Sequence, residues 1–213
     1  MKRVLFIIGL LMVSGPTFSQ TLQRSQLNVV ATDAQGGNFS GLRAFKPVLD
    51  RVLYRGGGPG GKVSLRTNQL QALCQNGFSS AGYLYPDNFN SPTQVNCGAQ
   101  NLEYRVVGFR AAGAEQTLRA IYNIIKSQST ANPQGPMFLH CWNGWHASGE
   151  ISAYALRQFC NMSGDEAARY WAQNIGDQGN LSKYGSIQNR IRNFNKISSL
   201  EITDAERARI CPQ

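Results

Sequence analysis

Short apolar runs alternate with amphipathic stretches between residues 52 and 159. Runs typical of buried strands cover residues 52–54, 78–85, 103–109 and 136–139. Apolar side chains spaced three or four positions apart, as on one face of a helix, occur in residues 67–75, 114–127 and 148–159. Strands that alternate with helices in this order predict an α/β fold whose central sheet is mainly parallel and flanked by helices.

The pattern becomes helical beyond residue 160. Capping boxes, in which Ser or Thr is followed three residues later by Glu, predict helix starts at Ser163 and Thr203. Ile187, Ile191 and Phe194 indicate a further helix between them. We expect a single domain over residues 20–213, with an irregular, polar lead-in at 20–40 and a helical C-terminal part.

Glycine and turn-forming residues mark the expected loops. The glycine-rich run 55–61 should end the first strand as a flexible loop, and residues 87–100 are rich in turn formers. The length of 213 residues fits one domain or two very small ones. The hydrophobic fraction of 42% is enough for a core and excludes a disordered chain.

The formal net charge of +9 favours anionic partners such as a phosphorylated small molecule or a phosphoprotein. Because no run of five basic residues occurs, we expect no nucleic-acid partner.

The N-terminus resembles a secretory signal peptide. Lys2 and Arg3 precede the short apolar run 4–13, and small residues follow at Thr17 and Ser19. The alternative, a membrane anchor, is less favoured because about 20 apolar residues are needed to cross a bilayer. We therefore expect residues 1–19 to be removed, leaving an exported protein, periplasmic or extracellular, with no transmembrane segment in the mature chain.

Export changes the interpretation of the five cysteines. In an oxidising compartment an odd number leaves one thiol unpaired. Among several possible pairings we expect Cys74 with Cys97 and Cys160 with Cys211, with Cys141 free.

The surroundings of Cys141 indicate an anion-binding site. A strand ends just before His140 and Cys141, a tight loop contains Gly144, and a helix starts near Ser148. Such a loop directs backbone N–H groups inward, and the helix N-terminus adds a positive dipole. A thiol there should have a lowered pKa and be a nucleophile for phosphoryl transfer.

This segment resembles the signature of the cysteine-dependent protein tyrosine phosphatase superfamily, especially its dual-specificity and inositol-phosphatase-like members. The signature is His-Cys, two residues, Gly, two residues, Arg, then Ser or Thr, and His140, Cys141, Gly144 and Ser148 match it. The resemblance covers roughly residues 38–160 and implies a phosphatase-like fold.

The resemblance also implies a role for each matching residue. Cys141 would form a phosphocysteine, His140 would orient the loop, and Ser148 would hydrogen-bond the sulfur. The phosphate would be held by the backbone of the loop residues Trp142, Asn143, Gly144, Trp145, His146 and Ala147.

Two departures from the signature matter. The signature Arg, which clamps phosphate oxygens and stabilises the transition state, is replaced by Ala147. The loop at residues 108–115, which should carry a general-acid Asp, has only Glu115. The favoured interpretation of Glu115 is an ordinary first-turn helix residue, and Asp87 is a weaker alternative acid.

Other side chains could compensate for the missing Arg. His146, Arg110 and Arg55 are the candidates, although a capping role for His146 and surface roles for the two arginines are the simpler interpretations. Trp142 and Trp145 could form an aromatic rim for an aryl or sugar substrate, or pack against the following helix.

Three functional hypotheses follow. The first is an exported phosphatase acting on phosphotyrosine or inositol phosphates through Cys141. The second is a pseudophosphatase that binds phosphorylated or anionic ligands without turnover. The third, less favoured, is redox or acyl-transfer chemistry that uses Cys141 with His140 or His146. None of them implies a cofactor, and the residues around Cys141 lack the spacing of a metal site.

Overall fold

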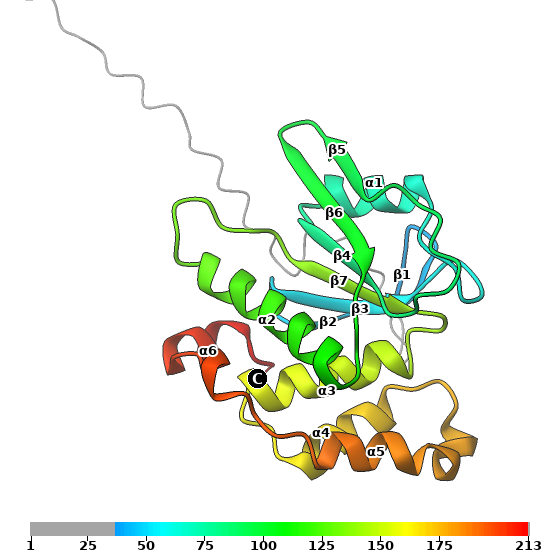
Figure 1. Cartoon of the computed structure of the whole chain (residues 1–213), viewed down its shortest axis with the longest axis vertical. Coiled ribbons are helices and arrows are strands. Elements are labelled where there is room, and N and C mark those ends of the chain that lie inside the picture. Colours follow the sequence, from blue (N-terminus) through cyan, green and yellow to red (C-terminus); the bar gives the residue numbers. More distant parts are fainter. Residues whose placement is uncertain (1–36, 213) are drawn as a thin grey trace, which may run out of the picture.

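A seven-stranded mixed sheet forms the centre of the protein in the computed structural model, which describes residues 37–212 (Figure 1). The strands are β1 (Gly37–Phe39), β2 (Leu42–Leu49), β3 (Leu53–Gly57), β4 (Ser80–Tyr83), β5 (Gln94–Cys97), β6 (Gln100–Val106) and β7 (Met137–Cys141). Their order is β1-β2-β3-β7-β4-β6-β5. The central strands β3, β7, β4 and β6 are parallel, and antiparallel pairs close both edges. The predicted α/β class with a mainly parallel centre is confirmed.

Helices cover both faces of this sheet (Figure 1). The described part of the chain has six α-helices: α1 (Thr67–Gln75), α2 (Ala111–Ser127), α3 (Ala147–Phe159), α4 (Gly164–Gln173), α5 (Gly185–Arg192) and α6 (Asp204–Ile210). Two 3₁₀ segments, η1 (Gln178–Tyr184) and η2 (Ser198–Leu200), connect the last helices. The first helix covers one face and α2 and α3 cover the other, while α4 packs on α3 and α5 on α4.

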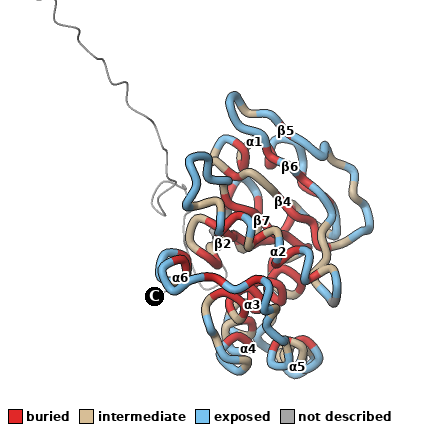
Figure 2. Tube along the Cα trace, turned by 60° about the vertical axis from the view of Figure 1, so that its left-hand side comes forward, coloured by how far each residue is buried: buried red, intermediate tan, exposed pale blue. Residues whose placement is uncertain are grey.

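Each face has its own core, because side chains alternate between the two faces of a strand. Under α1 the core is aromatic, with Phe45 stacked on Phe138 at 5.3 Å between ring centres. Under α2 and α3 it is mainly aliphatic and continues into α4 and α5. Figure 2 shows the buried central strands between exposed loops. Cys141 lies at the end of the central strand β7, at the boundary of the aliphatic core.

The predicted elements are largely confirmed. Helix α1 has the expected bounds, and Ser163 and Thr203 cap α4 and α6 through the expected capping boxes. Strand β2 was not predicted, because shifts in its pairing register and Ala44, with φ of +50°, break its alternation. Strand β5 lies inside the stretch expected to be turn-rich.

Two further expectations are corrected. The first strand does not stop at Arg55, since β3 continues through Gly57 and is paired with β7 along its whole length. The lead-in is not irregular throughout, because β1 already pairs with β2 at Gly37. The predicted signal peptide, residues 1–19, lies outside the described residues.

Within residues 37–212, no helix is long and apolar enough to cross a bilayer.

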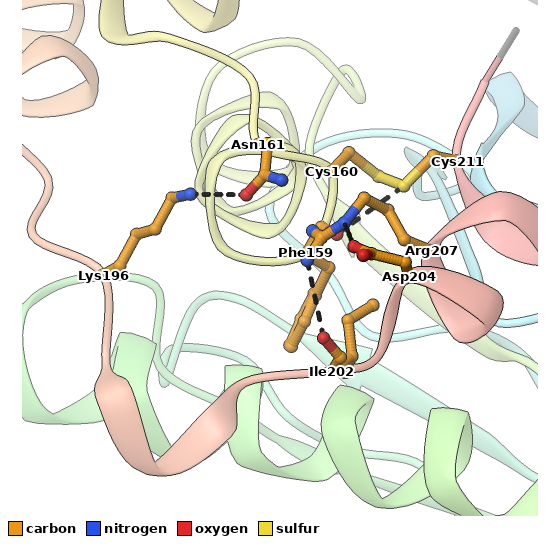
Figure 3. The surroundings of a disulfide bond; sticks show 8 residues. All are labelled: Phe159, Cys160, Asn161, Lys196, Ile202, Asp204, Arg207 and Cys211. Carbon is orange, nitrogen blue, oxygen red and sulfur yellow. Dashed lines mark hydrogen bonds and ion pairs between the residues drawn. A yellow bond between two sulfur atoms is a disulfide. The ribbon is translucent and has the colours of Figure 1, made fainter.

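The expected disulfide pairing is confirmed. Cys74 pairs with Cys97 and Cys160 pairs with Cys211, which leaves Cys141 as a buried free thiol. Figure 3 shows the second disulfide joining the end of α3 to the residue that follows α6. Two disulfides are compatible with an exported protein.

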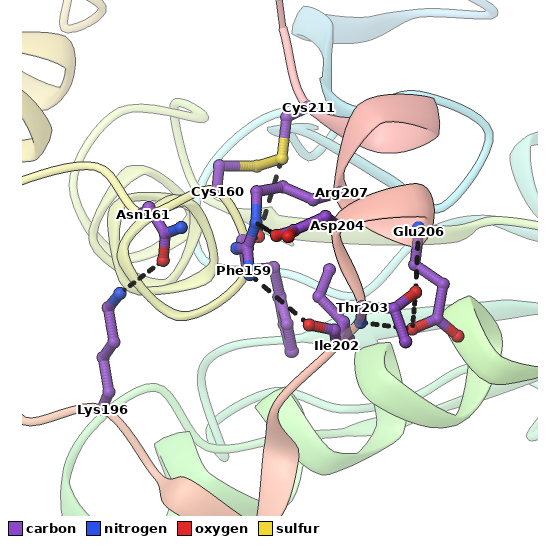
Figure 4. Close-up of polar contacts among 10 residues, drawn as sticks. All are labelled: Phe159, Cys160, Asn161, Lys196, Ile202, Thr203, Asp204, Glu206, Arg207 and Cys211. Carbon is purple, nitrogen blue, oxygen red and sulfur yellow. Dashed lines mark hydrogen bonds and ion pairs between the residues drawn. A yellow bond between two sulfur atoms is a disulfide. The ribbon is translucent and has the colours of Figure 1, made fainter.

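Polar contacts reinforce this junction between α3 and the C-terminal helix. The Arg207 guanidinium donates to the Phe159 and Ile202 carbonyl oxygens. Figure 4 adds the cap of α6, in which the Thr203 N–H donates to Glu206 Oε2 at 2.8 Å. The disulfide and the bond from Arg207 to Phe159 therefore hold the C-terminal helix against the end of α3.

Candidate functional site

The loop that follows Cys141 packs directly on the backbone of β3. Gly144 has φ of +78°, and a Cβ there would lie 2.6 Å from Gly56 C and from Gly57 N. A Cβ on Gly57 would in turn lie 2.6 Å from the Trp142 oxygen. Glycine on both sides of this contact lets the chain fold back tightly between β7 and α3.

The carbonyl groups of Cys141 and Trp142, at the start of this loop, accept hydrogen bonds from the neighbouring chain at Gly58 and Arg43. The Gly58 N–H donates to the oxygens of Cys141 at 2.9 Å and Trp142 at 3.1 Å. Arg43 Nη2 donates to the Trp142 oxygen at 2.8 Å, and its Nε donates to the Gly58 oxygen at 3.1 Å. By contrast, no acceptor among residues 37–212 pairs with the backbone N–H groups of residues 142–148. A run of free amides at a helix N-terminus is the arrangement that binds anions.

The Cys141 thiol faces a serine hydroxyl. Cys141 Sγ lies 3.3 Å from Ser148 Oγ, and Ser148 Oγ lies 3.3 Å from the Gly56 oxygen. Both side chains are buried. The single hydroxyl hydrogen of Ser148 can point to the carbonyl while the thiol is protonated, and to the sulfur when it is a thiolate. The resemblance assigned this role to Ser148, and the geometry permits it.

His140 is held in a buried chain of hydrogen bonds. Tyr104 Oη lies 2.8 Å from His140 Nε2 and accepts from the Leu65 N–H at 2.9 Å. The Tyr104 hydroxyl has one hydrogen to donate and a second lone pair to accept, so the direction of its bond to His140 follows the imidazole tautomer. Burial lowers the pKa of His140 to about 3. A hydrogen bond with the Cys141 backbone acts in the opposite direction and raises this pKa, but by less. A neutral, fixed imidazole can position the loop, but it cannot act as an acid at neutral pH.

The other loop residues divide between the mouth of the site and the helical core. Trp142 is 43% exposed beside Cys141 and can form a rim. Trp145 lies against Gly176. His146 contacts the Tyr184 ring at 4.5 Å between centres, and its pKa is lowered by burial, which Asp177 partly opposes. The contacts of Trp145 and His146 thus favour packing on the helical part of the molecule.

No cation occupies the signature position. Ala147 is buried in the aliphatic core at the start of α3. Neither candidate acid is placed over the loop by its contacts. Glu115 is half-exposed and pairs with Arg119 at 3.0 Å on the surface of α2. Asp87 is exposed, and its charge helps to raise the pKa of Tyr83. Glu115 is therefore an ordinary helix residue.

Arg55 and Arg110 have different surroundings. Arg110 is exposed, and its guanidinium lies 4.9 Å from the centre of the Phe109 ring. Arg55 is fully buried on β3, so the surface role expected for it is wrong. Its Nη2 donates to the Asn174 oxygen at 3.0 Å, while Nε and Nη1 have no hydrogen-bond acceptor among the described residues. A Cβ on Gly149 would lie 2.6 Å from Nη1, which places the guanidinium behind the first turn of α3.

No protein-family model matches this chain, and no curated protein matches its sequence.

Three residues near the loop were not expected from the sequence. Arg43 fixes the Trp142 carbonyl, Tyr104 fixes His140, and Tyr85 follows the end of β4 beside β7. The only sequence signal was the position of Tyr104 and Tyr85 within predicted strands. Their partners depend on the order of strands in the sheet, which the pattern of one chain does not determine.

Proposed function

We propose that the protein is an exported, cysteine-dependent phosphatase-like enzyme that hydrolyses phosphomonoesters through a phosphocysteine at Cys141. The observation that carries this proposal is the free Cys141 thiol, 3.3 Å from Ser148 Oγ, at the base of a loop of unpaired amides. The parallel strands on both sides of β7 also support a phosphatase-like fold.

The reaction has two steps. The Cys141 thiolate attacks phosphorus, and the P–O bond to the leaving group breaks while the loop amides hold the other phosphate oxygens. Water then attacks the phosphocysteine, the P–S bond breaks, and the sulfur leaves as a thiolate. A hydrogen bond from Ser148 stabilises that thiolate, and inorganic phosphate is released.

Part of the missing positive charge is supplied by Arg55. Its fully buried guanidinium lies against Gly149 in the first turn of α3. A charge in this poorly hydrated position acts over a longer range than a surface charge. It does not provide the two-point contact of the signature Arg, so turnover is slower by about two or more orders of magnitude than with such a clamp.

The substrate is a phosphotyrosine residue or an inositol phosphate. Exposed Trp142 offers a flat apolar surface to an aromatic or sugar ring beside Cys141. The net charge, +9 for the whole sequence and +7 without Lys2 and Arg3 of the expected signal peptide, favours a substrate of high negative charge. The two disulfides and the N-terminal sequence support a periplasmic or extracellular location.

A pseudophosphatase is the second candidate, and specific observations favour it. Ala147 carries no charge at the signature position, and Glu115 is paired on the surface of α2. The protein would then bind a phosphorylated or anionic ligand at the amide loop without hydrolysing it.

Steady-state hydrolysis by the mature protein tests the proposal. Wild type and Cys141→Ser are compared on an aryl phosphate, a phosphotyrosine peptide and inositol hexakisphosphate, after matched folding by circular dichroism. Turnover by wild type that disappears in Cys141→Ser supports the proposal that the protein is a cysteine-dependent phosphatase. Absence of turnover, combined with a rise in melting temperature on adding tungstate, supports the pseudophosphatase and contradicts the enzyme.

A further inference from the structure

The end of β4 brings a tyrosine to the edge of the sheet where Cys141 lies. β4 and β7 are parallel neighbours, with Tyr83 opposite His140. The backbone continues this pairing, because the Leu84 N–H donates to the His140 oxygen at 3.0 Å. This register places Leu84 opposite Cys141 and Tyr85 one position further along, opposite Trp142, and the Tyr85 side chain is half-buried.

Three segments surround the Tyr85 ring. The ring of Phe109, from the loop after β6, lies edge-on at 6.4 Å, and the Tyr83 ring lies at 5.8 Å. Lys62 Nζ, from the loop before α1, lies 5.5 Å from the ring centre. Because these loops follow strands on both sides of β7, the Tyr85 ring lies at the same edge of the sheet as Cys141.

The phenol also interacts with the thiol. Burial is the main cause that raises the pKa of Tyr85, and the charge and hydrogen bond of Cys141 add to it, while Arg110 opposes them. Tyr83 also responds to the charge of Cys141, but it is fully buried. Half-buried Tyr85 can therefore present a protonated hydroxyl both to Cys141 and to a bound substrate.

Among the described residues no carboxylate is shown in contact with Cys141, and the exposed Asp87, the weaker candidate acid, interacts with Tyr83. Glu115 is bonded on the surface of α2, and His140 is neutral and enclosed by Tyr104 and Tyr83. The loop after β6, where an acid was expected, begins with Val107, Gly108 and Phe109.

We propose that the Tyr85 hydroxyl protonates the leaving group in the first step of the reaction. This inference rests on the proposed phosphatase function. As the P–O bond breaks, its electron pair passes to the leaving oxygen, which takes the Tyr85 proton and leaves a phenolate. In the second step the phenolate takes a proton from the attacking water, and the P–S bond breaks to regenerate the Cys141 thiolate. Atoms and protons balance over the two steps without a further reactant.

Two properties follow from a tyrosine in this position. Alkyl phosphates, whose alkoxide leaving groups are strongly basic, depend on the acid, whereas 4-nitrophenolate leaves without a proton. The acid also stays protonated through neutral pH, because Cys141, Tyr83 and burial all raise the pKa of Tyr85. The positive charges that face this ring are Lys62 and Arg110. A carboxylic acid in the same place would lose its proton well below neutral pH.

The experiment compares wild type, Tyr85→Phe and the control Tyr122→Phe, a half-buried tyrosine on α2. For each, kcat/KM is measured on 4-nitrophenyl phosphate and on a simple alkyl phosphate between pH 5 and pH 9. We expect Tyr85→Phe to lose about 100-fold or more on the alkyl substrate and less than about threefold on the aryl substrate. We expect Tyr122→Phe to match wild type on both substrates.

Each contrary result has one meaning. Equal losses on the two substrates, or no loss, overturn the Tyr85 inference and leave the proposed function standing if wild type still requires Cys141. If kcat/KM falls as the pH rises from 5 to 7, and Tyr85→Phe does not change this profile, the acid is a carboxyl group instead. Absence of any Cys141-dependent turnover in wild type contradicts the phosphatase proposal, and the Tyr85 inference with it.

Discussion

At the scale of single residues, the site depends on groups that have almost no freedom. Gly144 and Gly57 bring two backbones into contact, and His140 is held between Tyr104 and Tyr83. Cys141 is the proposed nucleophile, but its neighbours determine where the loop amides point. Two predictions concern these supporting residues.

Gly144→Ala should destabilise the protein by about 1–3 kcal/mol more than Gly98→Ala. Both glycines have a similar positive φ, +78° and +80°, so both substitutions incur the same backbone strain. Only at Gly144 would the new Cβ also meet backbone atoms, since the space at Gly98 is open. The free energy of unfolding in urea measures the difference. Equal losses would mean that the loop does not pack on β3.

His140 should make stability depend on pH. Its pKa falls from 6.5 to about 3 on folding, so the unfolded chain binds more protons between these values. Stability should therefore fall as the pH drops from 6.5 to 3, by about 1.4 kcal/mol per pH unit for this group. Urea titrations of wild type and His140→Asn at pH 7, 6 and 5 measure the two slopes. A slope that His140→Asn does not reduce would contradict a buried neutral imidazole.

The sequence pattern indicated the proposed nucleophile more readily than it indicated the residues around it. Cys141, Gly144 and Ser148 could be recognised because their roles depend on local spacing along one strand, loop and helix. Arg43, Tyr104 and Tyr85 could not, because their contacts depend on which strands become neighbours of β7. The burial of Arg55 was missed because the glycines after it indicated a loop, whereas they continue a strand.

At the scale of elements, α3 connects the site to the helical C-terminal part. Glu150 is fully buried on α3 and accepts from Arg190 Nε at 2.6 Å and Nη2 at 3.0 Å. Tyr154 Oη donates to the same carboxylate at 2.7 Å. This contact fixes α5 against the helix whose first turn carries Ser148. Strand β2 could not be predicted from the alternation of polar and apolar residues, because its pairing register is irregular. This strand carries Arg43, which bonds to the Trp142 carbonyl of the site.

Arg190→Ala should cost about 3 kcal/mol or more of unfolding free energy, because it leaves the buried Glu150 carboxylate without its cation. Tyr154→Phe, which removes one hydrogen bond to the same carboxylate, should cost about 1–2 kcal/mol. Chemical denaturation of the two variants tests whether the loss of unfolding free energy is larger for Arg190→Ala. A smaller loss for Arg190→Ala than for Tyr154→Phe would contradict the assigned ion pair.

At the scale of the whole molecule, two disulfides hold the outer parts of the fold on the sheet. Cys74–Cys97 joins α1 to β5, and Cys160–Cys211 joins the end of α3 to the C-terminus across 51 positions. The cysteine count and the inferred export predicted one unpaired thiol, whereas the pairing itself was one choice among several, made from the positions of the cysteines along the chain. The sheet order could not be predicted in the same way, because it follows from how helices cover both faces.

Replacing Cys160 and Cys211 together by Ala should lower the free energy of unfolding by about 4 kcal/mol, through the greater entropy of the unfolded chain. Replacing Cys74 and Cys97 should cost slightly less, since they close a shorter loop of 23 positions. Denaturation of both double variants under oxidising conditions measures the two losses. No loss in either variant would contradict a structural role for these disulfides.

The central claim is that Cys141 becomes covalently phosphorylated during turnover. The most direct test mixes the mature protein with an excess of 4-nitrophenyl phosphate, denatures it rapidly, and examines the peptide containing Cys141 by mass spectrometry. We predict one phosphoryl group on Cys141, formed with an initial burst of nitrophenolate, and neither signal in Cys141→Ser. Hydrolysis that proceeds without the adduct, or that survives in Cys141→Ser, would contradict the claim.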